Sequence, residues 1–131
     1  MNLLLDTHAF LWWIAGDPAL SRPARTAISD DSNTVFVSAA SAWEIATKFR
    51  IGKLPGVATI ADDLTAVLDA QGFVPLPITF VHGQAAGALP GPLKDPFDRM
   101  LIAQATAESL TLVSGDDKVA RYASKSLKII R

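Results

Sequence analysis

Residues 2–6 are NLLLD and residues 110–116 are LTLVSGD, and both stretches are short apolar runs that lead to an acidic residue. A third run, LKII, occupies residues 127–130. Strands of a parallel sheet are covered on both faces and are therefore apolar throughout rather than alternating. Because such runs alternate with helix-like stretches, the sequence predicts an α/β fold with a mainly parallel sheet of four to five strands.

The segments between these runs carry helix start and stop signals. Residues 34–37 and 73–76 add two β-branched or aromatic runs that are typical of strands. Ser or Asp caps and closing Gly residues predict helices over residues 7–15, 22–29, 39–51, 59–71, 79–89 and 97–109, with a helical turn near 116–122. The pattern shows no repeat and no linker, so we expect one domain over residues 1–131.

Composition excludes several classes of protein. The chain has no Cys, so disulfides and thiolate metal sites are excluded, and half of its residues are hydrophobic, which excludes a disordered segment. No apolar run is long enough for a transmembrane helix, and the N-terminal run lacks the basic start of a signal peptide, so we expect a cytoplasmic protein. Because the net charge is −1, we expect any binding of nucleic acid to depend on a bound cation or on a few clustered Lys and Arg residues.

Four acidic residues are predicted to meet at one edge of the sheet. Asp6 and Asp116 follow apolar strands, and ligands of open α/β sheets bind at the carboxyl ends of strands. Glu44 and Asp98 lie in the first turns of helices that follow strands or lead back to them, and those turns lie near the same edge. Topology therefore brings all four acids towards one rim.

Each acid also has an ordinary structural explanation. Asp6 and Asp116 could cap helices, Asp98 could complement a helix dipole, and Glu44 could pair with Lys48 four residues later. The set is more informative, because two carboxylates ~4 Å apart repel by about 4 kcal/mol at an effective dielectric constant near 20. A hard divalent cation removes this repulsion, and carboxylate oxygens are ligands of Mg²⁺ and Mn²⁺.

Four motifs around these acids resemble those of PIN-domain ribonucleases of the VapC toxin group. They are LLLDTHAFLWW at 3–13, SAASAWEIATKFRIGKL at 38–54, DPFDRMLIAQA at 95–105 and TLVSGDDKVARY at 111–122. The motifs occur in the family's order and cover nearly the whole chain. At Leu93 the sequence departs from the family, whose members often have a His two residues before the third motif.

The resemblance implies a PIN-like three-layer α/β/α fold and a Mg²⁺-dependent endoribonuclease, with Mn²⁺ as the other candidate cation. It implies a homodimer and a cognate, VapB-like antitoxin as partners. The catalytic, metal-binding residues that it transfers are Asp6, Glu44, Asp98 and Asp116, with Asp117 as the alternative to its neighbour. It places the hydroxyls of Thr7 and Ser114 near the metal. Arg99 and Lys48 are our candidates for RNA contact.

Other functions remain open from the sequence alone. The same acids could serve a phosphatase or a structure-specific DNA nuclease, and a PIN domain could bind a metal or a partner without catalysis. A receiver-like signalling domain is disfavoured, because Ser38 and Pro77 follow the central strands where such domains need an Asp. The helix over 7–15 is apolar on all sides, so it either meets a partner or is covered within the chain.

Overall fold

The centre of the molecule is a parallel β-sheet with the strand order β3-β2-β1-β4-β5. The structure is a computed structural model that describes residues 1–54 and 56–131. Over these residues the elements are β1 (Asn2–Leu5), α1 (Thr7–Ala15), α2 (Arg22–Ser29), β2 (Thr34–Ser38), α3 (Ala39–Arg50), α4 (Ala58–Asp62), α5 (Leu64–Gln71), β3 (Val74–Leu76), α6 (Phe80–Ala88), α7 (Pro96–Ala107), β4 (Thr111–Val113), α8 (Asp117–Ala120) and β5 (Ile129–Ile130). The predicted fold class is thus confirmed, with every strand pair parallel.

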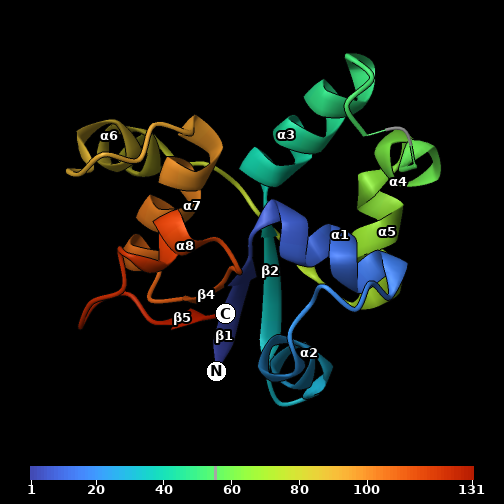
Figure 1. Ribbon diagram of the computed structural model, residues 1–131, viewed down its shortest axis with the longest axis horizontal. Helices are drawn as coiled ribbons and strands as arrows, with labels where there is room; N and C mark the ends of the chain where they lie inside the picture. The colour runs from blue at the N-terminus through green and yellow to red at the C-terminus, as the bar shows by residue number, and fades with distance from the viewer. Residues whose placement is uncertain (55) are drawn as a thin grey trace.

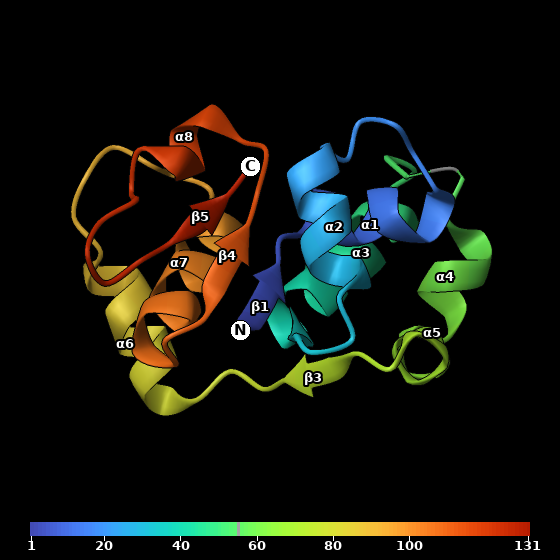
Figure 2. The ribbon, with the colours of Figure 1, turned by 90° about the horizontal axis from the view of Figure 1, so that it is seen from below.

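Two hydrophobic cores lie on opposite faces of this sheet. In β1, Leu3 and Leu5 belong to one core, which α1, α2 and α5 cover, and Leu4 belongs to the other, which α7 covers. All three leucines have no exposed surface. Figures 1 and 2 show the same division, with α6, α7 and α8 on one side of the strands and α1, α4 and α5 on the other. The three-layer arrangement follows from a central strand that is apolar on both faces.

The strand order explains how the predicted edge of acids is built. β1 pairs with β2 on one side and with β4 on the other, so the carboxyl ends of these three strands are neighbours. The chain leaves them at Asp6, Ser38 and Ser114, and the next helices start from the same edge. Ser38 also donates a hydrogen bond to Gln104 Oε1 at 2.5 Å, which joins the end of β2 to α7.

The apolar helix α1 is partly covered within the chain. Trp12 and Trp13 are half-buried and pack against the first core. The indole nitrogen of Trp13 donates to Gln71 Oε1 at 2.9 Å, and its ring packs against Phe73. Because residues 11–14 keep part of their surface exposed, the chain covers this apolar stretch only in part. No helix of the described residues is long and apolar enough to cross a membrane.

One predicted element differs from the structure. The single helix expected over residues 59–71 is divided into α4 and α5 at Asp63, whose backbone is extended (φ −149°, ψ 77°). The Asp63 carboxylate accepts a hydrogen bond from the backbone N–H of Ala66 and so caps α5. The division follows from this cap, because an Asp side chain competes with helical backbone bonds.

Candidate active site

The four predicted acids come from four different elements and are electrostatically coupled. Asp6 caps α1, Glu44 lies in α3, Asp98 lies in the first turn of α7, and Asp116 caps α8. After burial and the charge of Asp95, the charges of Asp6, Glu44 and Asp116 each contribute to the raised pKa of Asp98, so the four carboxyl groups lie near enough to interact. Sequence positions more than a hundred residues apart thus meet at one edge of the sheet.

Asp98 is the most strongly perturbed of these acids. Burial, followed by the negative charge of Asp95 and of the other three acids, raises its pKa from 3.8 to about 7. Because the folded state favours the protonated form, ionising this carboxyl group near neutral pH lowers the free energy of unfolding. A cation in the same space would favour the ionised form.

Asp6 is held in place from two sides. Its Oδ1 accepts a hydrogen bond from the backbone N–H of Ala9 at 2.7 Å, and the hydroxyl of Ser114 lies near enough to lower the pKa of the same carboxyl group. Burial nevertheless raises the pKa of Asp6, and the nearby Asp116 adds to that effect. Ser114 itself is fully buried at the end of β4. Its hydroxyl therefore joins the strand end to an acid of the site.

Glu44 is oriented by one hydroxyl group and one cation. Thr7 Oγ1 donates to Glu44 Oε1 at 2.6 Å and lies 3.0 Å from Ser41 Oγ. The Lys48 ammonium pairs with Glu44 Oε2. Glu44, Thr7 and Ser41 are all buried, whereas Lys48 is partly exposed. Thr7 therefore positions Glu44 directly, a contact that the sequence did not reveal.

The structure separates the two adjacent aspartates. Asp116 faces the acid cluster, since its charge raises the pKa of both Asp6 and Asp98. Asp117 is exposed and pairs with Arg131, which lowers the pKa of Asp117. Asp116, and not Asp117, is therefore the one of the pair that lines a cleft together with Asp98.

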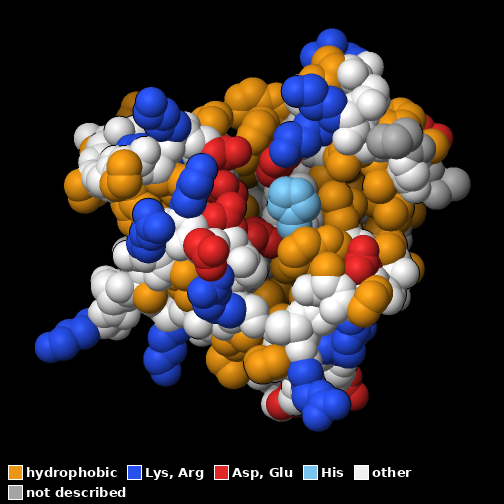
Figure 3. All heavy atoms as spheres, viewed as in Figure 1, with side chains coloured by type: hydrophobic (Ala, Val, Ile, Leu, Met, Phe, Trp, Pro, Cys, Tyr) orange, Lys and Arg blue, Asp and Glu red, His pale blue; other side chains and the backbone are white. Residues whose placement is uncertain are grey.

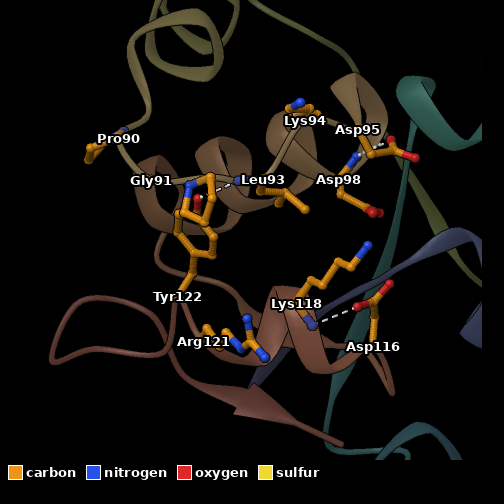
Figure 4. A pocket seen from close by; sticks show the side chains of 11 residues that line it. Pro90, Gly91, Leu93, Lys94, Asp95, Asp98, Asp116, Lys118, Arg121 and Tyr122 are labelled. Carbon is orange, nitrogen blue, oxygen red and sulfur yellow. Dashed lines mark hydrogen bonds between the residues drawn. The ribbon is translucent and has the colours of Figure 1, made fainter.

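A cleft of about 740 Å³ opens beside Asp98 and Asp116. One wall is the Pro90–Asp95 segment before α7, and the other is formed by Lys118 of α8 with Arg121 and Tyr122 after it. Figure 4 shows the two acids at one end of the cleft and Tyr122 at the other. Figure 3 shows acidic side chains gathered near the centre of this face, with Lys and Arg side chains along both sides.

The donor set fits a hard divalent cation. It consists of carboxylate oxygens with hydroxyl groups beside them, which suits Mg²⁺ or Mn²⁺ and not zinc. Over the described part of the chain, no three His, Cys, Asp or Glu side chains already form a metal cage. Mg²⁺ does not need one, because it keeps several waters and is held by few carboxylates.

Arg99 has a different place from the one predicted for it. Its Nε donates to Ala86 O at 3.1 Å, its Nη1 to Leu93 O at 2.7 Å, and its Nη2 to the carbonyls of Gly87 and Leu89. All three guanidinium nitrogens are thus directed to main-chain oxygens. A phosphate contact would have to replace these bonds, so we assign Arg99 to holding the segment between α6 and α7.

The fold and the site together define a family. The family model of the PIN domain matches residues 3–125, and the chain belongs to this family. Among curated proteins, the chain is similar to Ribonuclease VapC16 of Mycobacterium tuberculosis, with 38% identity over 58 residues. That match spans 44% of this chain and 41% of the relative, which is less than half the length of either protein.

Solved structures share the architecture over the full length. The crystal structure of VapBC2 from Rickettsia felis, bound to a DNA fragment from their promoter, matches 99% of this chain and 98% of its own with a TM-score of 0.71 and 18% identity. The VapBC-5 structure from Mycobacterium tuberculosis matches the same shares with a TM-score of 0.62 and 19% identity. At these identities the likeness shows the fold, and the PIN-like architecture is thereby confirmed.

Proposed function

We propose that this protein is a Mg²⁺-dependent endoribonuclease of the VapC type, the toxin of a toxin–antitoxin pair. The observation that carries the proposal is the approach of four acids from four elements to one edge of the sheet, where burial, the charge of Asp95 and the charges of the other three acids raise the pKa of Asp98 to about 7. Membership in the PIN family and similarity to a protein named Ribonuclease VapC16 support the choice of RNA as substrate.

The site residues divide into two roles. Asp6, Glu44, Asp98 and Asp116 would hold the cation, with Mn²⁺ as an alternative to Mg²⁺. The bound cation supplies a centre that lowers the pKa of a water molecule and stabilises charge on a phosphate. Ser114 holds Asp6 and Thr7 holds Glu44, so both hydroxyls keep acids in place. Lys48 lies beside Glu44 and is retained as a candidate for RNA contact.

A protein antitoxin is the proposed partner. The structures that share this fold include those described as VapBC and as a toxin–antitoxin complex from Klebsiella pneumoniae. We propose a VapB-like antitoxin, a homodimer of this chain, and a cytoplasmic site of action, where cellular RNA is available. Co-expression with the neighbouring reading frame, followed by measurement of the mass of the complex, tests the assembly.

Cleavage of cellular RNA by the purified, antitoxin-free protein tests the activity. With Mg²⁺ we expect discrete RNA fragments, and we expect none with EDTA. Asp116→Asn should remove the activity, whereas Asp117→Asn should keep it, because Asp117 is exposed and paired with Arg131. A parallel panel of DNA and a phosphomonoester separates the rival enzymes. Intact RNA with cleaved DNA would overturn the ribonuclease, and no turnover of any substrate by folded, Mg²⁺-loaded protein would favour a binding domain.

Replacing Thr7 by Val should weaken the site without changing its volume. The substitution removes the hydroxyl that bonds to Glu44 Oε1, and loss of a residue that orients a metal ligand typically costs about 10-fold or more in activity or metal affinity. We expect a higher Mg²⁺ concentration for half-maximal cleavage. Thr7→Ser keeps the hydroxyl and should restore the wild-type value. An unchanged Mg²⁺ requirement in Thr7→Val would contradict this role.

A further inference from the structure

The cleft beside the acid cluster changes character along its length. At one end lie Asp98 and Asp116, which the proposed function assigns to the cation. Further along, the walls carry the cations Lys118 and Arg121, and the far end is lined by Tyr122 with Pro90 and Gly91. Holding a metal ion requires only the acidic end of the cleft, and not the basic and apolar surfaces that follow it.

The basic residues of the cleft are exposed and available to a ligand. Lys118 and Arg121 are exposed, and in Figure 4 the Lys118 side chain extends towards the end where Asp98 and Asp116 lie. The two residues are separated by about one helical turn, so their side chains share one side of the cleft. In a chain with a net charge of −1, cations beside an acid cluster are a local attraction for an anion.

The far end of the cleft is closed by a fixed contact. The backbone N–H of Leu93 donates to the Tyr122 hydroxyl at 3.3 Å. Gly91 has φ +96°, and a Cβ atom at this position would lie 2.4 Å from the same hydroxyl oxygen. The close approach of Gly91 and Tyr122 therefore joins the two walls. The cleft is a short, blind groove rather than a channel, and its volume of about 740 Å³ is in the range of small-ligand sites.

We propose that this groove binds the nucleotide next to the cleavage position, with Lys118 and Arg121 contacting its phosphates. The inference rests on the proposed ribonuclease function. A blind groove beside the reactive centre accepts a base that has left its helical stack, and unstacked bases of single-stranded RNA pack against aromatic and apolar side chains. The half-buried Tyr122 and the exposed Pro90 and Pro92 supply such a surface. Lys118 and Arg121 would neutralise the phosphates of the RNA backbone that enters from the end where Asp98 and Asp116 lie.

The test measures binding separately from cleavage. A fluorescent single-stranded RNA is titrated with the non-cleaving Asp98→Asn protein in EDTA at several salt concentrations, with and without K118Q and R121Q together. We expect K118Q/R121Q to weaken binding at least about 10-fold. The slope of the logarithm of the binding constant against the logarithm of the salt concentration should become shallower by roughly 1.4, since each phosphate contact to a single strand contributes about 0.7. The matched control, K125Q with K128Q, removes two exposed charges outside the groove and should change neither quantity beyond about twofold.

Cleavage by the same variants with an intact Asp98 completes the test. K118Q/R121Q should raise KM more than it lowers kcat, because the residues contact substrate away from the reacting atoms. If the wild-type protein cleaves RNA and K118Q/R121Q binds within twofold of its parent, the groove proposal alone is overturned. If the wild-type protein neither binds nor cleaves RNA, the proposed function fails and the groove proposal fails with it.

Discussion

Asp98→Asn should reduce RNA cleavage at least about 100-fold while making the metal-free protein more stable. Both effects have one cause. The Asp98 carboxyl group is half-buried among Asp6, Glu44 and Asp116, so its negative charge is unfavourable unless a cation is present. The amide keeps the size of the side chain, removes the charge, and no longer attracts Mg²⁺.

The sign of the pH dependence follows from the same pKa. The folded-state pKa of Asp98 is about 7 against 3.8 for the free side chain, so the folded protein binds more protons between these values. The stability of the metal-free protein should therefore fall as pH rises from about 4 to about 7 and level off above it. Asp98→Asn should make this slope shallower but not flat, because the pKa of Asp6 is raised as well.

Thermal unfolding in EDTA at pH 5 and pH 8 measures the effect. At pH 8 we expect Asp98→Asn to raise the free energy of unfolding by roughly 1 kcal/mol over the wild type, or Tm by a few degrees. The increase stays below what the full pKa shift would give, because solvent screens a half-exposed carboxyl group. The control is Asp69→Asn, which removes an exposed charge on α5. A loss of stability at pH 8 in Asp98→Asn would contradict the prediction, and so would full RNA cleavage by this variant.

Arg99→Met should destabilise the protein by about 2–4 kcal/mol. The methionine keeps the aliphatic packing, but the guanidinium donates to four main-chain carbonyls, those of Ala86, Gly87, Leu89 and Leu93. These bonds fasten the end of α6 and the following segment to α7. Without them the carbonyls lose a charged donor, and hydrogen bonds to charged groups are stronger than neutral ones.

Urea unfolding gives the free-energy change, and hydrogen exchange over residues 89–95 locates it. Arg50→Met, at the exposed end of α3, changes the same charge and should alter stability by less than about 0.5 kcal/mol. Because residues 90–95 form one wall of the cleft, cleavage should fall together with the protection of this segment. Unchanged stability in Arg99→Met, with weaker RNA binding, would instead assign Arg99 to substrate contact.

The main elements of the fold follow from local sequence patterns. The apolar runs at 2–5 and 111–113, with acids or hydroxyls directly after them, predicted buried parallel strands that the structure contains. The order of the strands could not be predicted, because pairing depends on contacts between distant segments. The helix α6 was hard to predict from its two glycines, and the structure supplies the reason that it forms: Thr79 and His82 make a reciprocal capping box.

The acids of the candidate site could be predicted from the sequence, but the residues that position them could not. Asp6 and Asp116 follow strands, and this position places them at the sheet edge whatever the strand order. The bond from Thr7 to Glu44, by contrast, joins residues 37 positions apart. Lys118 and Arg121 gave no signal either, since only the folded chain places them opposite the Pro90–Asp95 segment. Arg99 was a candidate for RNA contact because it is a basic residue next to an acid of the third motif, but in the folded chain it donates to backbone carbonyls.

β1 lies between β2 and β4, so completing this edge of the sheet requires segments that are distant in the sequence to pair. β1 (Asn2–Leu5) receives β4 as its second neighbour only after residues 111–113 have been synthesised, and Asp116 follows them. Such long-range pairing forms late in folding. A nascent chain, or a product truncated before β4, therefore has Asp6, Glu44 and Asp98 without the fourth acid or the strand that supports it.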